Sequence, residues 1–394
     1  MRIIRSRYLW VMATIVLAVG YAVSCTKDDQ VLDIPQPINS ATDLVALKVS
    51  APPTLDGIID ASWANAQKLQ FSTTVPEVTG DIFRGYVGNI IPSVTLRSMY
   101  DNDNIYFLAE WVDPTESLTR LPWYFDPVAK KWFQEKGAPV FNANGSIARK
   151  AFYEDKIAML WNINNSVQGW NSGTCYRSCH TGLPASDGSS RHYTNYPTER
   201  IDMWHWKSVR GGVNGPNMFE DQHQWHTYPN GRKGDDGNDV YVNNVQTLGT
   251  LTVPKYVIPA RNNYGWILQT EVDSKVALTV TAVDANGVLT LEDGSTIDPN
   301  IGTDYQRIGE GHGPKVIPGL TIGSYTGSRA DIPCKATYTG SGWILEFKRA
   351  LKTADALNDI DFSSLADQYF GFAIFENAQI AHSIKANMVL KFQK

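Results

Sequence analysis

Short runs of β-branched and aromatic residues, separated by Asp, Asn and Gly, recur along the chain from about residue 44 to its end. Such runs are typical of β-strands, and the polar residues between them are typical of turns. Helical periodicity is scarce, with a turn or two expected at 61–68 and at 362–368. We therefore predict an all-β fold, an antiparallel β-sandwich with long loop insertions. Strands are expected at 93–100, 105–111, 156–162, 276–283, 342–347, 370–375 and 388–392.

Turns and long interruptions divide this strand pattern. The segment 101–104, Asp-Asn-Asp-Asn, lies between two strand-like runs and predicts a hairpin turn, because Asn and Asp tolerate the left-handed backbone conformation. Residues 163–250 are rich in Gly, Asn, Asp, His and Trp, and residues 284–340 are rich in Gly and Pro. Loops this long in a compact domain are usually functional, and the first of them holds the unusual chemistry described below.

The first 24 residues have the features of a targeting segment, with a basic start and an apolar run at 9–23 that is short for a membrane span. The run ends in Ala22-Val23-Ser24-Cys25, which resembles the site where signal peptidase II cuts and the cysteine receives lipid. The acidic pair that follows resembles the surface-export signal of Bacteroidetes lipoproteins. We expect an exported protein, lipid-anchored through Cys25 to the outer membrane on its periplasmic face or the cell surface. A plain secretory peptide is the alternative.

These features predict three parts: a signal peptide at 1–24, a linker at 25–43 and a folded domain at 44–394. Removing the three arginines of the signal peptide leaves 32 basic residues against 40 acidic ones, a formal charge of −8. This charge argues against a nucleic-acid partner. The 12 tryptophans of the whole chain suit aromatic walls around a flat cofactor or a sugar.

The strongest local signal is Cys175-Tyr176-Arg177-Ser178-Cys179-His180, two cysteines followed at once by a histidine. Two thiols can bond the two vinyl groups on one edge of a porphyrin, and the histidine can then bind the iron from that edge. The usual attachment motif has two residues between the cysteines, whereas three stand here. The extra residue must be absorbed by a bulge in the loop. We predict covalently attached haem c held by Cys175, Cys179 and His180.

Two other interpretations of these cysteines remain open. In the first, Cys175 and Cys179 form a local disulfide or remain free thiols. In the second, they bind zinc together with a histidine such as His192. Zinc is disfavoured because no second cysteine pair lies nearby. Cys334 stands alone before a strand-like run, and we expect it to be a small buried hydrophobic residue.

A haem iron in an electron-transfer protein usually has a second axial ligand. Met99 is a candidate because it ends a predicted strand beside the Asp-Asn turn. In an extended strand, Trp204 and Trp206 face one side while His205 and Lys207 face the other. The candidate second ligands are Met99, His205, Lys207, His223, His226 and His382.

Five segments have the order and spacing of a known family. They are Leu55-Asp56-Gly57 with Ala61-Ser62-Trp63, Ala109 to Thr115, Asp155 to Asn162, Asp202 to Lys207, and Gly342 to Glu346 with Arg349 and Leu351. Together they resemble the haem-binding domain of the ethylbenzene dehydrogenase γ-subunit family, over residues 44–394.

The resemblance implies a β-sandwich related to family 9 carbohydrate-binding modules and to the cytochrome (DOMON) domain of cellobiose dehydrogenase. It implies a b-type haem between a methionine and a lysine, for which Met99 and Lys207 are the matching positions, and a molybdenum subunit as electron donor. The cysteine motif departs from that pattern and resembles a cysteine-containing branch of the superfamily. His180 would compete with Lys207 for the iron.

These observations predict a monohaem c-type cytochrome that exchanges electrons with a redox partner protein and is not a catalyst in its own right. The pocket is expected to include Met99, Trp204, His205 and Lys207 beside the motif, with His180 and Met99 on the iron. The alternative is a surface glycan-binding module on the same sandwich, without haem. A hydrolase is disfavoured because the chain has neither a nucleophile elbow nor a paired-carboxylate spacing.

Overall fold

The computed structural model describes residues 42–75, 90–144, 146–178, 194–213, 215–226, 231–262 and 264–394. These residues belong to one compact unit of the chain. The predicted signal peptide, Cys25 and most of the predicted linker lie outside the described residues, as do Cys179, His180 and His192.

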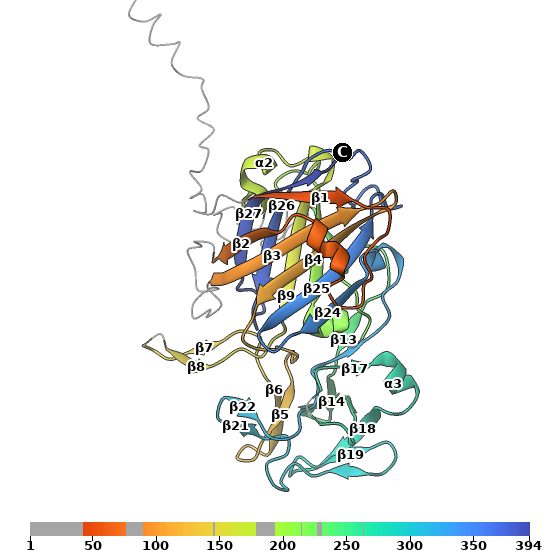
Figure 1. Cartoon of the computed structure of the whole chain (residues 1–394). Helices are drawn as coiled ribbons and strands as arrows, with labels where there is room; N and C mark the ends of the chain where they lie inside the picture. Colours follow the sequence, from red (N-terminus) through yellow and green to blue (C-terminus); the bar gives the residue numbers. More distant parts are fainter. Residues whose placement is uncertain are drawn as a thin grey trace, which may run out of the picture. The chain divides into compact units, whose positions relative to one another are not determined.

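A 12-stranded sheet forms the frame of the fold (Figure 1). Its strands pair in the order β12-β11-β10-β9-β26-β27-β1-β3-β4-β25-β24, and β2 pairs with β27 and β3. All pairings are antiparallel except those of β1 with its two neighbours. The strands are β1 (Asp43–Lys48), β2 (Leu69–Thr74), β3 (Ile90–Tyr100), β4 (Asn104–Val112), β9 (Lys156–Asn162), β10 (Ile201–Lys207), β11 (Glu220–Gln224), β12 (Arg232–Gly234), β24 (Cys334–Tyr338), β25 (Gly342–Ala350), β26 (Gln368–Phe375) and β27 (Ser383–Phe392).

The sheet folds over on itself into two layers. Aromatic rings from strands far apart in the pairing order meet between the layers, with centroids 5.8 Å apart for Phe107 of β4 and Trp204 of β10. Trp111 of β4 and Trp206 of β10 are also 5.8 Å apart. We call the buried residues between the layers the main core. The predicted β-sandwich is therefore confirmed, with alternate residues of each strand turned into the main core.

The predicted hairpin turn and one of the predicted helices are present. Asp101 Oδ1 accepts hydrogen bonds at 2.8 Å from the backbone N–H groups of Asp103 and Asn104 between β3 and β4. A short 3-10 helix, η1 (Ala61–Asn65), lies within the first predicted helix. The helix predicted at 362–368 is wrong, since only a turn forms there before β26 begins. The other described helices are η3 (Ile163–Asn165), α2 (Trp170–Gly173), η4 (Thr174–Arg177), η5 (Ser208–Gly212), α3 (Gln269–Asp273) and η6 (Gly327–Ala330).

A second core lies outside the sandwich and draws on the segments predicted as loops. Trp123, Phe125 and Trp132 pack there with residues from 253–317, including Leu289 and Tyr305. The strands outside the sandwich have two to four residues, too few to give a clear alternating pattern in the sequence, except β18 (Leu278–Val283), which confirms the strand predicted at 276–283. They are β5 (Trp123–Asp126), β6 (Lys131–Gln134), β7 (Val140–Phe141), β8 (Ile147–Arg149), β13 (Tyr241–Asn243), β14 (Gln246–Leu248), β15 (Leu251–Val253), β16 (Tyr256–Val257), β17 (Ile267–Leu268), β18 (Leu278–Val283), β19 (Leu289–Leu291), β20 (Thr296–Ile297), β21 (Arg307–Ile308), β22 (Gly311–His312) and β23 (Leu320–Ile322).

A buried ionic cluster joins the two layers at one end of the main core. Arg349 of β25 lies 3.3 Å from Asp202 of β10 and 3.0 Å from Asp359, and 3.8 Å from Asp221 of β11. All four side chains are at most 1% exposed. Burial raises the pKa of Asp202 to about 7, although Arg349 opposes the shift. Burial and the neighbouring Asp202 raise the pKa of Asp221. The guanidinium is thus the counter-charge for two carboxyl groups of the opposite layer and for Asp359, which lies between β25 and β26.

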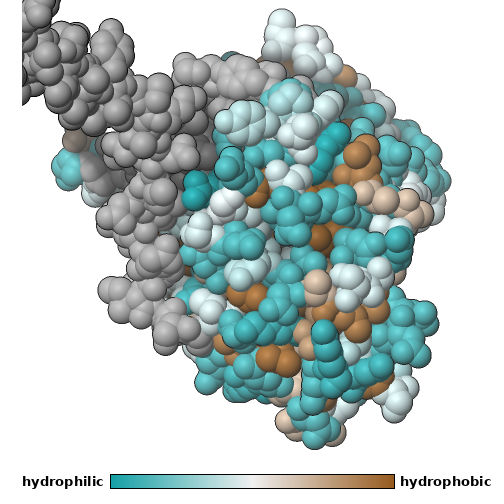
Figure 2. Space-filling view, turned by 90° about the horizontal axis from the view of Figure 1, so that it is seen from above, coloured by the Kyte–Doolittle hydropathy of each residue, from teal (hydrophilic) through white to brown (hydrophobic). Residues whose placement is uncertain are grey.

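The surface is mostly polar where it is described. On the face seen in Figure 2, hydrophobic residues form separate spots among hydrophilic ones. None of the helices in the described parts of the chain combines the length and apolar character that crossing a membrane requires.

Candidate functional site

Cys175, the first cysteine of the motif, is buried against the sheet. It lies in η4 and is 4% exposed. A Cβ atom added to Gly371 of β26 would lie 3.3 Å from the Sγ of Cys175. A glycine therefore permits the close approach of the motif to the strand. Cys179 and His180 lie outside the described residues.

The wall beneath Cys175 is the side of the sheet that faces away from the main core. We call this side the Cys175 face. Paired residues of β10, β9 and β26 form three rows across it. The rows are, from the Cys175 end, Met203, Leu160 and Gly371; then His205, Ala158 and Ala373; and last Lys207, Lys156 and Phe375. Three of the six residues in its first two rows, Gly371, Ala158 and Ala373, are small.

The cavity between Cys175 and this wall is small in the described residues. It has a volume of about 20 Å³ and is lined by Cys175, Met203, His382 and apolar side chains of β9, β26 and β27. A porphyrin is larger than this cavity, so it would lie over the wall and not inside the cavity.

His205 stands in the middle row with one ring nitrogen unused. Its Nδ1 donates to Gln222 Oε1 at 3.3 Å, and its Nε2 has no hydrogen-bond partner among the described residues. The side chain is buried, and burial together with nearby Lys207 and Lys156 holds its pKa well below the usual range. The imidazole is therefore neutral at pH 7, with the Nε2 lone pair available. Histidine ligands of metals commonly have this arrangement, with the other nitrogen hydrogen-bonded to an oxygen.

A second histidine, His382, lines the same wall. Its Nδ1 donates to the carbonyl oxygen of Ile380 at 2.6 Å. Burial lowers its pKa to about 4, so it is also neutral at pH 7. The ring of Phe375 lies against both histidines, with its centroid 4.5 Å from that of His382 and 5.7 Å from that of His205.

The last row of the Cys175 face holds two lysines, and burial holds the pKa of both amines well below the usual range. Lys207 forms an ion pair with Glu220. Lys156 donates to the carbonyl oxygen of Gln379 at 2.9 Å, and its Nζ lies 4.1 Å from the centre of the Phe375 ring. Both lysines are 2% exposed. Two buried lysine side chains thus lie at the end of the face opposite Cys175.

Of the other predicted pocket residues, Trp204 points into the main core and not toward Cys175. Met99 lies on the outer side of the other layer, packed with Trp63 and Tyr106, so the main core separates it from Cys175. The structure therefore brings Cys175, His205 and Lys207 to one face and leaves Met99 and Trp204 elsewhere. Sequence reasoning missed Met203, whose signal was its spacing of two residues from His205.

The other residues singled out in the sequence are His223, His226 and Cys334, and each contacts neighbouring side chains of the fold. His223 Nδ1 lies 2.5 Å from Asp235 Oδ1 on the main-core side of β11. The ring of His226 lies 5.1 Å from that of Trp225. Cys334 is buried in the main core, which confirms its prediction as a small hydrophobic residue, and burial raises the pKa of its thiol.

The tryptophans serve mainly as core residues. Trp225 and Trp266 are half-buried, and the other nine in the described residues are buried. Aromatic side chains this deeply packed stabilise the fold by burying large apolar areas. None of the tryptophans among the described residues is exposed.

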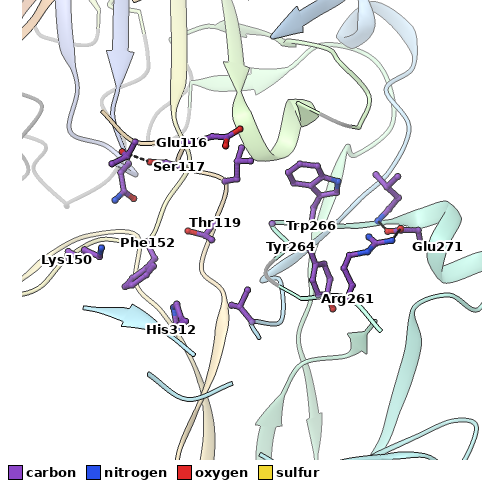
Figure 3. Close-up of a pocket in the computed structure, with 16 residues that line it drawn as sticks. Glu116, Ser117, Thr119, Lys150, Phe152, Arg261, Tyr264, Trp266, Glu271 and His312 are labelled. Atoms are coloured by element: carbon purple, nitrogen blue, oxygen red, sulfur yellow. Dashed lines mark hydrogen bonds and ion pairs between the residues drawn. The ribbon is translucent and has the colours of Figure 1, made fainter. Parts of the chain in front are cut away.

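A larger cavity, of about 750 Å³, lies between the sandwich and the second core. Figure 3 shows Phe152 and His312 on one side of it and Tyr264 and Trp266 on the other. Burial lowers the pKa of His312 to about 4, so its ring is neutral. The volume suits a small organic ligand. None of the described residues of the cysteine motif lines this cavity.

Comparisons with known proteins place the chain in a family and give distant structural neighbours. The family model described as ethylbenzene dehydrogenase matches residues 60–386. A comparison with curated proteins gave no match. A family 9 carbohydrate-binding module from Caldicellulosiruptor kristjanssonii, in complex with glucose, is 9% identical, with a TM-score of 0.30, and the match covers 89% of this chain and 96% of that one. A putative carbohydrate-binding protein from Bacteroides uniformis is 7% identical, with a TM-score of 0.29 and coverage of 90% and 100%. Similarity this weak says nothing about what this chain binds.

Proposed function

Because this chain belongs to the ethylbenzene dehydrogenase family, we propose that it is an electron-transfer protein with one haem c on the Cys175 face. Cys175 and Cys179 would hold the haem through thioether bonds, and His180 and His205 would bind its iron. The partner that supplies or accepts the electron is a redox protein that the structure does not identify.

One observation carries this proposal. The motif cysteine Cys175 lies buried on the same face as His205, whose Nε2 is buried and without a partner among the described residues. A buried polar atom left unpaired is costly, and such atoms commonly mark a site for a missing ligand. A metal ion bound to Nε2 would satisfy it. The small residues Ala158, Gly371 and Ala373 lie beside Cys175 and His205 on this face.

Each residue has a distinct task. When bound, haem supplies an iron that changes between two oxidation states by one electron. The cysteines fix one edge of the ring, and Gln222 orients the imidazole of His205 through Nδ1. The apolar wall keeps water from the ring, which is one of the factors that set the potential of a haem.

The experiment is haem staining on a denaturing gel after expression of the full chain with a cytochrome c maturation system. We expect a stained band and a reduced-minus-oxidised spectrum of a low-spin haem. The double variant Cys175→Ala/Cys179→Ala should give an unstained band of equal amount. Cys334→Ala is the matched control, since that cysteine is buried in the main core, and it should stain like the parent.

A colourless parent protein would overturn the proposal. The sandwich would then be tested as a glycan-binding module, by titration against a panel of polysaccharides. Binding that is unaffected by the two cysteine changes would support that alternative.

We also propose that the protein is exported and anchored by lipid on Cys25. The support is the sequence Ala22-Val23-Ser24-Cys25 after the apolar run. In bacteria that process lipoproteins, mass spectrometry of the mature N-terminal peptide should find an acylated cysteine, and Cys25→Ala should release the protein from the membrane fraction. An unmodified N-terminus at another residue would contradict this expectation.

A further inference from the structure

The cavity of about 750 Å³, which we call the large cavity, has aromatic side chains on two sides. Trp266 and Tyr264 are half-buried, and Phe152 lies on the side opposite them (Figure 3). The face of an aromatic ring carries partial negative charge and attracts C–H groups, whose hydrogens are slightly positive. These walls therefore suit a ligand that presents an apolar C–H surface.

Gly265, between the two half-buried rings in the sequence, fixes where they lie. A Cβ atom added to Gly265 would overlap the carbonyl oxygen of Leu118, so a larger residue would force the backbone to shift. The segment that carries Tyr264 and Trp266 is thus held directly against the chain at Leu118. Both rings and Leu118 line the large cavity. The position of the aromatic wall is therefore set by backbone packing.

The charged groups of the large cavity balance each other. They are two cationic and two acidic side chains, Lys150, Arg261, Glu116 and Glu271. Arg261 Nη2 lies 2.5 Å from Glu271 Oε1, so these two charges already neutralise each other. The ring of His312 adds no charge at pH 7, because burial lowers its pKa to about 4. The described lining therefore has no net charge with which to attract an ion.

Uncharged polar groups complete the lining. Thr115 and Thr119 supply hydroxyl groups, and Asn377 supplies an amide. The Oδ1 of Asn377 accepts a hydrogen bond from the backbone N–H of Tyr153 at 2.8 Å, so the NH₂ group of this amide is the part left for a ligand. The lining thus holds both donors and acceptors. A ligand with several hydroxyl groups matches such a mixed set, because each hydroxyl both donates and accepts.

We infer that the large cavity binds a neutral sugar of one or two rings. A sugar ring has C–H groups on its faces, which can stack on Trp266, and hydroxyl groups around its edge, which can bond to the polar side chains. The volume lies in the range of small-molecule sites. None of the residues that form the Cys175 face lines the large cavity, so this site goes beyond the proposed function and does not depend on it.

The test is isothermal titration calorimetry of the full mature chain with glucose, galactose, mannose, cellobiose, maltose and lactose. Glucuronate, galacturonate, glucosamine and galactosamine, which add one charge to the same rings, are titrated in parallel. We expect a neutral sugar to bind more tightly than any of the charged ones. Trp266→Ala should weaken its binding by about tenfold or more, because the stacking surface is lost. Trp266→Phe should keep part of the affinity.

Trp225→Ala is the matched control. Trp225 is also half-buried but does not line the large cavity, so its loss should leave the affinity unchanged. Glu116→Ala changes an exposed carboxylate of the lining and should weaken binding, because a carboxylate accepts strong hydrogen bonds from hydroxyl groups. Circular dichroism shows whether each variant is folded. If Trp266→Ala is not, Trp266→Phe and Glu116→Ala decide, and unchanged binding in both overturns the inference.

The outcomes separate this inference from the proposed function. A folded parent that binds none of the neutral sugars, or binds the charged ones equally well, would overturn the inference. The same holds if Trp266→Ala and Trp225→Ala bind alike. A haem-stained parent that binds no sugar keeps the proposed function and loses the inference. A colourless parent whose sugar binding is weakened only in the cavity variants does the reverse.

Discussion

Replacing Arg349 with methionine is expected to lower the free energy of unfolding by about 3–5 kcal/mol, which is the usual cost of removing one partner from a buried ion pair. Domains are typically stable by only about 5–15 kcal/mol, so this is a large part of the total. Methionine keeps much of the apolar volume of arginine, so the loss reports mainly on charge. The change leaves Asp202, Asp221 and Asp359 buried together without a cation.

The loss of stability in Arg349→Met should be larger at high pH than at low pH. The pKa of Asp202 in the folded protein is about 7, above its usual value of 3.8. A carboxyl group whose pKa is raised by folding favours the folded state while it is protonated. This contribution to stability is complete at pH values below the unfolded pKa and is lost as the pH rises through the folded pKa. Without Arg349 the carboxyl groups must be protonated to remain buried. Denaturant unfolding should therefore show a smaller defect at pH 5.5 than at pH 8.

A combined variant separates charge from packing in this cluster. Adding Asp202→Asn and Asp359→Asn to Arg349→Met removes two of the unpaired charges and should restore part of the stability at pH 8. If the combined variant is no more stable than Arg349→Met, or if the defect is the same at both pH values, then the electrostatic account of the cluster is wrong.

Replacing His205 with alanine is expected to leave the haem covalently attached but to change its absorption spectrum from low-spin to high-spin. Loss of the second strong axial ligand has this effect, whereas the thioether bonds do not depend on His205. Staining on a denaturing gel and the spectrum of the same sample measure the two properties independently. A low-spin spectrum in His205→Ala would exclude His205 as the ligand, and His382→Ala and Met203→Ala would then test the other candidates on the Cys175 face.

Met99→Ala is the matched control for this experiment. Met99 is fully buried on the outer side of the opposite layer. Its truncation should cost about 2–5 kcal/mol of stability through the cavity that it leaves. The spectrum of the folded protein should stay low-spin. A high-spin spectrum in Met99→Ala and an unchanged one in His205→Ala would restore the ligand set that the family resemblance implies.

The alternating pattern of the sequence was sufficient to predict the sandwich and, at the site, which side of strand β10 each side chain faces. Trp204 and Trp206 alternate with His205 and Lys207, and the structure turns the tryptophans into the main core and the other pair to the Cys175 face. Such alternation is local, because successive residues of a strand point to opposite sides whatever the strand pairs with. The hairpin turn at 101–104 was predictable for the same reason, since its hydrogen bonds join residues two or three positions apart.

The contents of the site depended on pairings between distant segments. β9 pairs with β26 more than 200 residues later, and this pairing brings Gly371 beneath Cys175 and places Ala373 in the row of His205. Local propensity carries no information about which strands become neighbours, so the sequence placed Met99 on the iron and kept His205 and His382 only as further candidates. The pairing of β3 with β4 places Met99 on the other outer face.

The sequence by itself determined the strand-rich class, the alternation of faces and the cysteine motif, because each of these is written in residues close together along the chain. The tertiary structure decided which side chains meet: Arg349 with the carboxyl groups of the opposite layer, His205 with the face beneath Cys175, and Lys156 at the end of that face opposite Cys175. It also built a second core in which most strands are too short to recognise, since strands of two to four residues gain their stability from tertiary packing and not from local preference.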